Sequence, residues 1–173
     1  HEVCPFELSL DASLYCDIII CDYNYVFDPR VYLKRFFTEK NNCVFLIDEA
    51  HNMVERARSM YSAQLTKSLF KDMLNLIDKD AKKLRKTVRS IIKYLKEKEQ
   101  LCEAHPFYAS KEAFDDFLSL LLRYQKEADR YLQQEHEKNE ELKPMYFEVL
   151  AYLRIAELYD DHYITWFRKE NHD

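Results

Sequence analysis

The stretch CVFLIDEAHNMVERA, residues 43–57, joins a short apolar run to a group of charged side chains. A brief, continuously apolar segment bounded by polar residues is typical of a strand in a parallel sheet that is covered on both faces. The pattern therefore predicts a buried strand over 43–47. Asp48 and Glu49 would then stand at its carboxyl end, which is the edge where α/β sheets bind their ligands.

The residues before this stretch predict the rest of an α/β layer. Residues 5–16 (PFELSLDASLYC) space their leucines as a helix does, and the β-branched run DIIICDY (17–23) predicts another buried strand. In FDPRVYLKRFFTEKN (27–41), Asp28 is placed to cap a helix and Pro29 to be its first residue. The first 50 residues are thus expected to run helix, strand, helix, strand.

Beyond about residue 60 the pattern is helical. Apolar residues recur every three or four positions over 65–77, 81–101, 111–138 and 143–163, which predicts four amphipathic helices. AHPFYAS (104–110) and NEELKP (139–144) interrupt this pattern, and YITWF (163–167) predicts a short returning strand. The side chains expected to form the core are Leu65, Leu69, Leu84, Ile91, Phe117, Leu121, Tyr146, Leu150 and Leu153.

The composition is that of a packed globular protein, except that glycine is absent. The 173 residues are 47% apolar and carry a net charge of −5, which argues against a uniform coat of nucleic acid. The longest apolar runs are too short for a bilayer, so a soluble, cytoplasmic protein without a membrane partner is expected. The chain contains no glycine, and loops that cradle nucleotide phosphates need glycine for close backbone approach. A nucleotide site would therefore be incomplete here.

The pair Asp48–Glu49 has two interpretations. In nucleotide-hydrolysing motors, an aspartate at the end of a buried strand holds Mg²⁺ and the following glutamate orients or deprotonates the attacking water. In the alternative, Asp48 only caps the next helix and Glu49 is a solvated residue of its first turn. The apolar residues before the pair and the Ala-His after it match a DEAH box and favour the catalytic interpretation.

Two segments, CPFELSLDASLYCDIIICDYNYVFDPRVYLKRFF (4–37) and VFLIDEAHNMVERAR (44–58), resemble the XPD/DinG family of iron–sulfur superfamily 2 DNA helicases. The resemblance implies that Asp48 serves Mg²⁺, Glu49 the catalytic water, and His51 the coupling between nucleotide and DNA sites. It also implies that Cys4 is one of the four thiolate ligands of a [4Fe–4S] cluster.

The resemblance also implies a fold and partners. We expect a mainly α chain in which a partial RecA-like α/β segment with short parallel strands (1–60) precedes a helical arch bundle (61–160), and 161–173 return toward the motor domain. The complete protein would use ATP, Mg²⁺ and the [4Fe–4S] cluster, and would move 5′ to 3′ along single-stranded or forked DNA with its remaining helicase domains in cis. The phosphate loop, the other cluster cysteines and the second motor domain are missing from the sequence. We therefore expect a fragment without bound cofactor or activity of its own.

Residues 79–98 are predicted to form a strongly basic helix. The expected buried stripe is Ala81, Leu84, Val88, Ile91, Ile92 and Leu95. The stripe leaves Lys82, Lys86, Arg89 and Lys93 on the outer face. These cations either form a solvated face or contact DNA phosphates, and the sequence leaves both interpretations open. Tyr94, Phe107 and Tyr108 are candidates for base stacking or for the core.

Three further cysteines, Cys16, Cys21 and Cys43, lie in or beside the predicted apolar elements and are expected to act as small buried hydrophobes. Asn24 and Tyr25 are candidates for the DNA path or for packing. The rival to the helicase interpretation is a non-catalytic helical protein-interaction module whose DEAH sequence is accidental.

Overall fold

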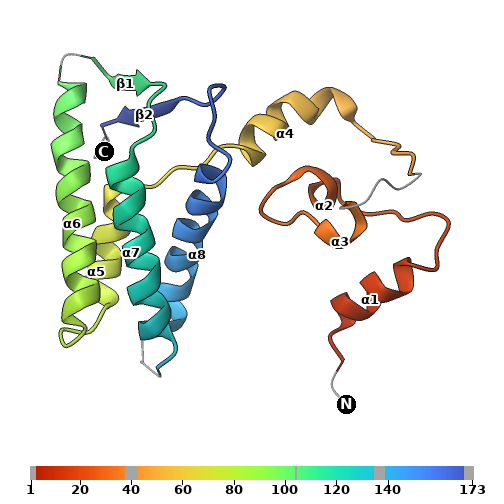
Figure 1. Cartoon of the computed structure of the whole chain (residues 1–173), viewed down its shortest axis with the longest axis horizontal. Coiled ribbons are helices and arrows are strands. Elements are labelled where there is room, and N and C mark those ends of the chain that lie inside the picture. The colour runs from red at the N-terminus through yellow and green to blue at the C-terminus, as the bar shows by residue number, and fades with distance from the viewer. Residues whose placement is uncertain (1–2, 38–42, 104, 135–138, 170–173) are drawn as a thin grey trace. The chain divides into compact units, whose positions relative to one another are not determined.

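The computed structural model describes residues 3–37, 43–103, 105–134 and 139–169. Within these ranges the chain forms eight α-helices, two 3₁₀ helices and one two-stranded sheet, so it is mainly helical as predicted. The chain divides into two compact units, His1–Met60 and Tyr61–Asp173 (Figure 1). We call them the N-terminal unit and the four-helix unit.

The N-terminal unit is built from short helices. Its elements are α1 (Pro5–Ser13), α2 (Asn24–Phe27), α3 (Lys34–Phe37), the 3₁₀ helix η1 (Ala50–Asn52) and α4 (Met53–Met60). The predicted first helix is confirmed as α1, which begins at Pro5 because a proline at the first position gives up no helical hydrogen bond.

The two buried strands predicted for this unit are wrong. Residues 18–22 and 43–47 have neither helix nor strand, and Ile18, Ile20 and Leu46 are 82%, 95% and 95% exposed. A strand exists only where its backbone groups pair with a neighbour, and neither segment has such a partner within the described ranges. Cys16, Cys21 and Cys43, which were expected to be buried, are exposed.

The helix predicted to start at Pro29 is also wrong in its position. Residues 29–31 form a turn, and α3 starts only at Lys34. Asp28 follows α2 instead of capping α3, because its carboxylate is bound by Arg30 inside that turn. The last part of the predicted helix, residues 38–41, lies outside the described residues.

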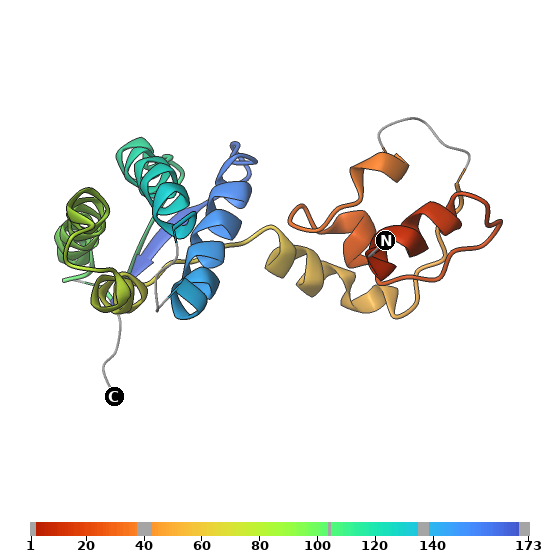
Figure 2. The same cartoon turned by 90° about the horizontal axis from the view of Figure 1, so that it is seen from below.

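The four amphipathic helices predicted for the second unit are confirmed. They are α5 (Lys67–Leu76), α6 (Lys82–Lys98), α7 (Asp115–Leu132) and α8 (Asn139–Ala156). Each helix packs against the next and α5 also contacts α8, so the four surround one core, as the nearly end-on view in Figure 2 shows. All nine predicted core residues belong to this cluster, either buried or packed against it.

Polar side chains form hydrogen bonds with backbone groups at both ends of α5. The Thr66 hydroxyl accepts a hydrogen bond from the Leu69 backbone N–H at 3.2 Å, which is a standard N-cap. At the other end, the Arg85 guanidinium of α6 donates to the carbonyls of Leu74 and Ile77. Arg85 thus satisfies backbone carbonyls that the end of α5 leaves unpaired, and a positive charge is favourable there.

The interruption predicted at 139–144 is wrong, since α8 begins at Asn139 and contains Pro144. Glu140 and Glu141 favour a helix start because they lie near the positive end of the helix dipole. Leu142 is 1% exposed, so burial anchors a first turn that the proline alone would disfavour.

A small antiparallel sheet adjoins the helices. Strand β1 (Phe107–Ser110) pairs with β2 (Thr165–Arg168), and the 3₁₀ helix η2 (Glu99–Cys102) links α6 to β1. The predicted returning strand is confirmed as β2, whereas its partner β1 lies in a stretch expected to be only an interruption. Nowhere in the described ranges does a helix combine the length and apolar character of a membrane span.

Candidate functional site

Asp48 and Glu49 form a tight turn rather than the end of a strand. The Asp48 carboxylate accepts a hydrogen bond from the Glu49 backbone N–H at 2.9 Å. Glu49 has φ 49° and ψ 36° and is the one described residue with positive φ. A residue other than glycine in this left-handed region costs on the order of 1–3 kcal/mol. The one backbone position with positive φ among the described residues is therefore the predicted catalytic glutamate, Glu49.

His51 lies beside Glu49. It is part of η1, and its Nε2 is 3.2 Å from Glu49 Oε2, with both side chains largely exposed. A histidine nitrogen at this distance can donate a hydrogen bond to the carboxylate and hold its orientation. The structure thus brings two of the predicted residues into contact, with Asp48 on the same turn.

The fit of this turn to Mg²⁺ can be judged from its donor atoms. Carboxylate oxygens suit the ion, which commonly takes one or two protein carboxylates and fills its other positions with water and substrate phosphates. Asp48 is exposed and fits that role. The turn is not a closed metal site, because the one described cluster with metal-ligand geometry is the exposed set Asp160, Asp161 and His162.

The cysteines do not assemble a cluster site within the described residues. Cys4 is exposed immediately before α1, and Cys16, Cys21 and Cys43 are also exposed. No set of three cysteines comes within ligand distance there, whereas a [4Fe–4S] cluster takes four thiolates. Cys4 fits the role of a single ligand and no more.

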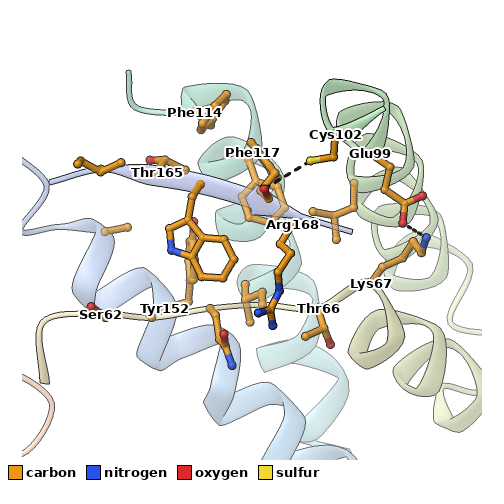
Figure 3. Close-up of a pocket in the computed structure, with 18 of the residues that line it drawn as sticks. Ser62, Thr66, Lys67, Glu99, Cys102, Phe114, Phe117, Tyr152, Thr165 and Arg168 are labelled. Carbon is orange, nitrogen blue, oxygen red and sulfur yellow. Dashed lines mark hydrogen bonds and ion pairs between the residues drawn. The ribbon is translucent and has the colours of Figure 1, made fainter. Parts of the chain in front are cut away.

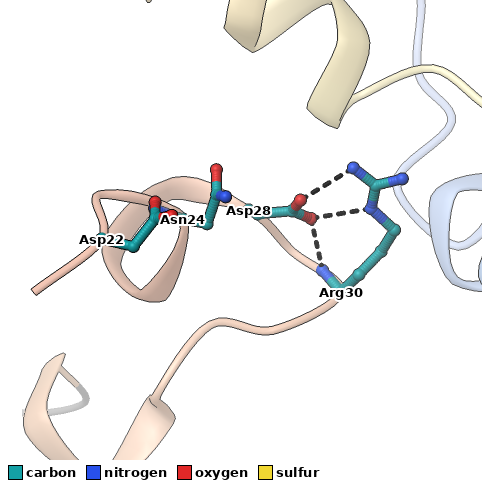
Figure 4. Close-up of polar contacts among 4 residues, drawn as sticks. All are labelled: Asp22, Asn24, Asp28 and Arg30. Carbon is teal, nitrogen blue, oxygen red and sulfur yellow. Dashed lines mark hydrogen bonds and ion pairs between the residues drawn. The ribbon is translucent and has the colours of Figure 1, made fainter.

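An ion pair with a buried carboxylate in the N-terminal unit escaped the sequence analysis. Asp28 Oδ1 accepts from the backbone N–H and the Nε of Arg30, both at 2.9 Å, and Oδ2 accepts from Nη2 at 2.7 Å (Figure 4). The Asp28 side chain is 8% exposed and that of Arg30 37%. Burial raises the pKa of Asp28, but the hydrogen bonds and charge of Arg30 outweigh it, so the net pKa lies below its ordinary value. The spacing Asp-Pro-Arg was the available signal.

Asn24 and Tyr25 make local contacts in the same region. The Asn24 backbone N–H donates to Asp22 Oδ1 at 2.9 Å, which sets the start of α2 (Figure 4). The Tyr25 ring lies 6.0 Å from the Phe6 ring of α1, and its carbonyl accepts from the Leu33 N–H at 3.0 Å. These contacts are those of a folded turn.

The basic face of α6 is exposed as predicted. Lys82, Lys86, Arg89 and Lys93 are spaced by four, three and four residues, so they form one stripe. Leu84, Val88 and Ile91 are buried on the other side. Tyr94 belongs to the core, since its ring stacks on Phe117 at 5.2 Å and burial raises its pKa to about 12.

The four-helix unit also contains a pocket of about 860 Å³. Its walls are the extended segment 61–66, the end of α6 with η2, and strand β2 (Figure 3). Inside it the Lys67 ammonium pairs with the Glu99 carboxylate, and the Cys102 thiol donates to the Phe167 carbonyl at 3.4 Å. Sequence reasoning did not predict this pocket, because its walls come from distant parts of the chain.

Comparison with known proteins gives matches to helicases. Residues 1–70 match the DEAD_2 family model. The Regulator of telomere elongation helicase 1 homolog of Caenorhabditis elegans is 33% identical over 66 residues, which is 38% of this chain and 6% of that protein. The Fanconi anemia group J protein homolog of Gallus gallus is 32% identical over 103 residues, covering 54% of this chain and 8% of that protein.

A third relative extends further along the chain. The General transcription and DNA repair factor IIH helicase subunit XPD of Schizosaccharomyces pombe is 25% identical over 126 residues, which is 66% of this chain and 16% of that protein. The chain therefore spans less than a fifth of the length of these three relatives. No solved structure matches the chain.

The family model, the relatives and the DEAH sequence all support the same class of protein. They confirm the resemblance to iron–sulfur superfamily 2 helicases of the XPD/DinG type. Residues 1–70, which match the DEAD_2 model, include the turn formed by Asp48, Glu49 and His51.

Proposed function

We propose that this chain is part of an ATP-dependent DNA helicase, with Asp48 serving Mg²⁺ and Glu49 the attacking water. The observation that carries the proposal is the DEAH sequence at 48–51 within the DEAD_2 match. His51, 3.2 Å from the Glu49 carboxylate, is the residue through which the state of the nucleotide site is transmitted to DNA. By analogy with the resembled family, the helicase moves 5′ to 3′ on single-stranded or forked DNA.

The two units have separate tasks in this proposal. The N-terminal unit is the partial motor domain 1, residues 61–160 are the helical arch, and residues 161–173 return toward the motor. The arch guides single-stranded DNA, and the basic face of α6 offers four exposed cations for its phosphates. Cys4 supplies one ligand of the [4Fe–4S] cluster in the complete protein.

In this proposal, the DEAH turn contributes to ATP hydrolysis through Asp48, Glu49 and His51. The Glu49 carboxylate positions a water or accepts its proton, and His51 holds that carboxylate in orientation. Mg²⁺, when bound near Asp48, supplies positive charge that offsets the charge of the phosphates. Because the chain has no glycine, the phosphates are held by a loop elsewhere in the complete helicase.

The test is DNA-stimulated ATP hydrolysis by the complete helicase with Glu49→Gln. Removing the group that orients the water should lower turnover by about 10²–10⁴-fold while nucleotide binding is kept. Glu55→Gln is the matched control, because Glu55 is an exposed glutamate of α4 whose ion pair among the described residues is with the exposed Arg58. Near-normal turnover of Glu49→Gln would overturn the assignment.

The alternative is a non-catalytic protein-interaction module with an accidental DEAH sequence. The exposed apolar side chains of the N-terminal unit, such as Ile18, Ile20 and Leu46, favour it, because surface groups of this kind mark interaction sites. The same assay separates the two functions, since the module predicts no difference between the Glu49 and Glu55 variants.

A further inference from the structure

The β1–β2 hairpin has one face that packs on the helices and one that is open. Phe167 lies on the packed face, where its ring meets Phe114 edge-on at 4.9 Å. Residues paired directly across an antiparallel sheet point to the same side, and the register pairs Phe107 with Arg168 and Ala109 with Trp166. We call these four residues the open face of the hairpin.

The open face presents aromatic rings to solvent. Phe107 is 59% exposed and Trp166 48%, and the register places them diagonally across this face, with Ala109 and Arg168 at the other two positions. Large aromatic side chains contribute most of their stabilisation when buried, so their exposure on a short hairpin adds little to the fold. Exposed aromatics grouped on a sheet face indicate a surface that binds something flat and apolar.

Arg168 adds a cation to this face. Its guanidinium lies 5.7 Å from the centre of the Trp166 ring, and no described carboxylate pairs with it. A guanidinium stacked on an aromatic ring keeps its N–H groups at the edge, free to hold an anion such as a phosphate. The same strand end carries the exposed Lys169.

The open face leads into the pocket. Trp166 and Arg168 both line it, and Figure 3 shows Arg168 projecting into it on the side of Ser62 and Thr66. The volume of about 860 Å³ is in the range that holds a small organic group. Inside the pocket, Glu99 pairs with Lys67. The lining also includes Glu103, so Arg168 and Lys169 leave it with one positive charge in excess.

We propose that the open face binds single-stranded DNA, with a base stacked on Trp166 or Phe107 and a phosphate held by Arg168. The choice of DNA as the polymer rests on the proposed function. The pairing of ring and guanidinium is what a nucleotide needs, because each nucleotide has a flat base and an anionic phosphate. The site differs from the basic face of α6, which offers cations for phosphates and no exposed ring for a base.

The test uses the fact that Trp166 is the single tryptophan of the chain. Its fluorescence is followed while the 173-residue chain is titrated with oligothymidylate, with an abasic oligonucleotide of equal length, and with an acidic peptide. No ATP is present, so the result does not depend on the DEAH assignment. Quenching by oligothymidylate but not by the abasic strand is expected, because only a stacked base changes the surroundings of the indole.

Two variants add an independent readout from the anisotropy of labelled oligothymidylate. Arg168→Ala should weaken binding about fivefold or more, as expected for a lost phosphate contact. Trp166→Leu should weaken it about tenfold, as expected for a lost base contact. Arg123→Ala is the matched control, because Arg123 is an exposed arginine of α7 that does not line the pocket. Unchanged circular dichroism shows that the variants remain folded.

Other outcomes overturn the site in distinguishable ways. Binding without quenching, equally strong in Arg168→Ala and Arg123→Ala, places DNA elsewhere and leaves the helicase proposal standing. Quenching by the acidic peptide alone assigns the pocket to a protein partner. No binding of oligothymidylate at all rejects the open face as a DNA site, while the Glu49→Gln assay still decides the motor function.

Discussion

The Tyr131 hydroxyl near the end of α7 donates a hydrogen bond to Asp78 Oδ2 at 3.0 Å and accepts one from the Asp78 backbone N–H at 3.3 Å. Asp78 lies in the turn between α5 and α6, so the contact ties the third helix of the unit to the connection between the first two. Burial and the neighbouring carboxylate of Asp78 raise the pKa of Tyr131, while the backbone hydrogen bond opposes them.

Tyr131→Phe should therefore destabilise the four-helix unit by about 1 kcal/mol, because it leaves Asp78 without this partner. Tyr124→Phe is the matched change, since the Tyr124 hydroxyl is buried and has no hydrogen-bond partner among the described residues. Removing an unpaired buried hydroxyl should leave stability unchanged or raise it. Urea unfolding followed by circular dichroism measures both, and equal losses in the two variants would contradict the hydrogen-bond account.

Asp28→Asn should destabilise the turn after α2 at neutral pH by about 1–2 kcal/mol, since it removes the charge that Arg30 binds. Arg30 is over a third exposed, so solvent screening keeps the loss moderate. Because the folded pKa of Asp28 lies below its ordinary value of 3.8, the stabilisation is present above that value and disappears as pH falls through the folded pKa.

The measurement is hydrogen exchange at the Leu33 amide, which donates to the Tyr25 carbonyl across this turn. Exchange should be about 5–30-fold faster in Asp28→Asn at pH 7, and the difference should shrink as the pH falls below 3.8 through the lowered pKa of Asp28. Asp22→Asn is the control, because an exposed Asn can still accept the Asn24 N–H. A difference that does not depend on pH would show that charge is not the cause.

Reversing Lys82, Lys86, Arg89 and Lys93 to glutamate should weaken single-stranded DNA binding by the complete helicase without regard to base sequence. The log–log slope of affinity against salt should also flatten by up to about 3, because each phosphate contact releases counterions. A control with the same change of charge reverses Lys71, Lys111, Arg123 and Lys126, which are exposed outside α6. Equal effects of the two sets would mean that net charge, not the α6 face, governs binding.

The 173-residue chain by itself should fold as a helical protein without ATPase activity and without a cluster. Its described residues offer no glycine loop for phosphates and only scattered cysteines. The four-helix core should give a circular dichroism spectrum dominated by helix and a cooperative melt. ATP hydrolysis, or stoichiometric iron in the purified chain, would contradict this prediction.

The four-helix unit was largely predictable because its determinants are local. Helical periodicity over long segments identified α5 to α8, and the same periodicity selected core residues such as Leu84 and Phe117. The predicted start of the last helix is wrong because it treats Pro144 as an interruption. Pro144 lies inside α8, and Leu142 is buried. The start of α8 depends on burial against neighbouring helices, and a local sequence pattern carries no information about that burial.

The N-terminal unit and the site were less predictable because they depend on partners distant in sequence. The runs at 18–20 and 44–47 have strand-like composition, yet a strand needs a neighbour and none is present in the described ranges. The contact of Glu49 with His51 follows from a DEAH spacing that was recognised. The Asp28–Arg30 pair and the open face of the hairpin depend on a turn and a register that periodicity does not report.

The left-handed backbone at Glu49 has a consequence for how this position tolerates substitution. In a chain without glycine, a glutamate adopts a conformation that Gly and Asn adopt at much lower cost. Glu49→Gly and Glu49→Asn should therefore relax the turn even as they abolish the proposed catalysis. Position 49 would then show a trade-off between stability and activity, because the inactive Gly and Asn variants would be more stable to unfolding than the active protein. A screen for thermal tolerance alone would favour substitutions here that a screen for ATP turnover would reject.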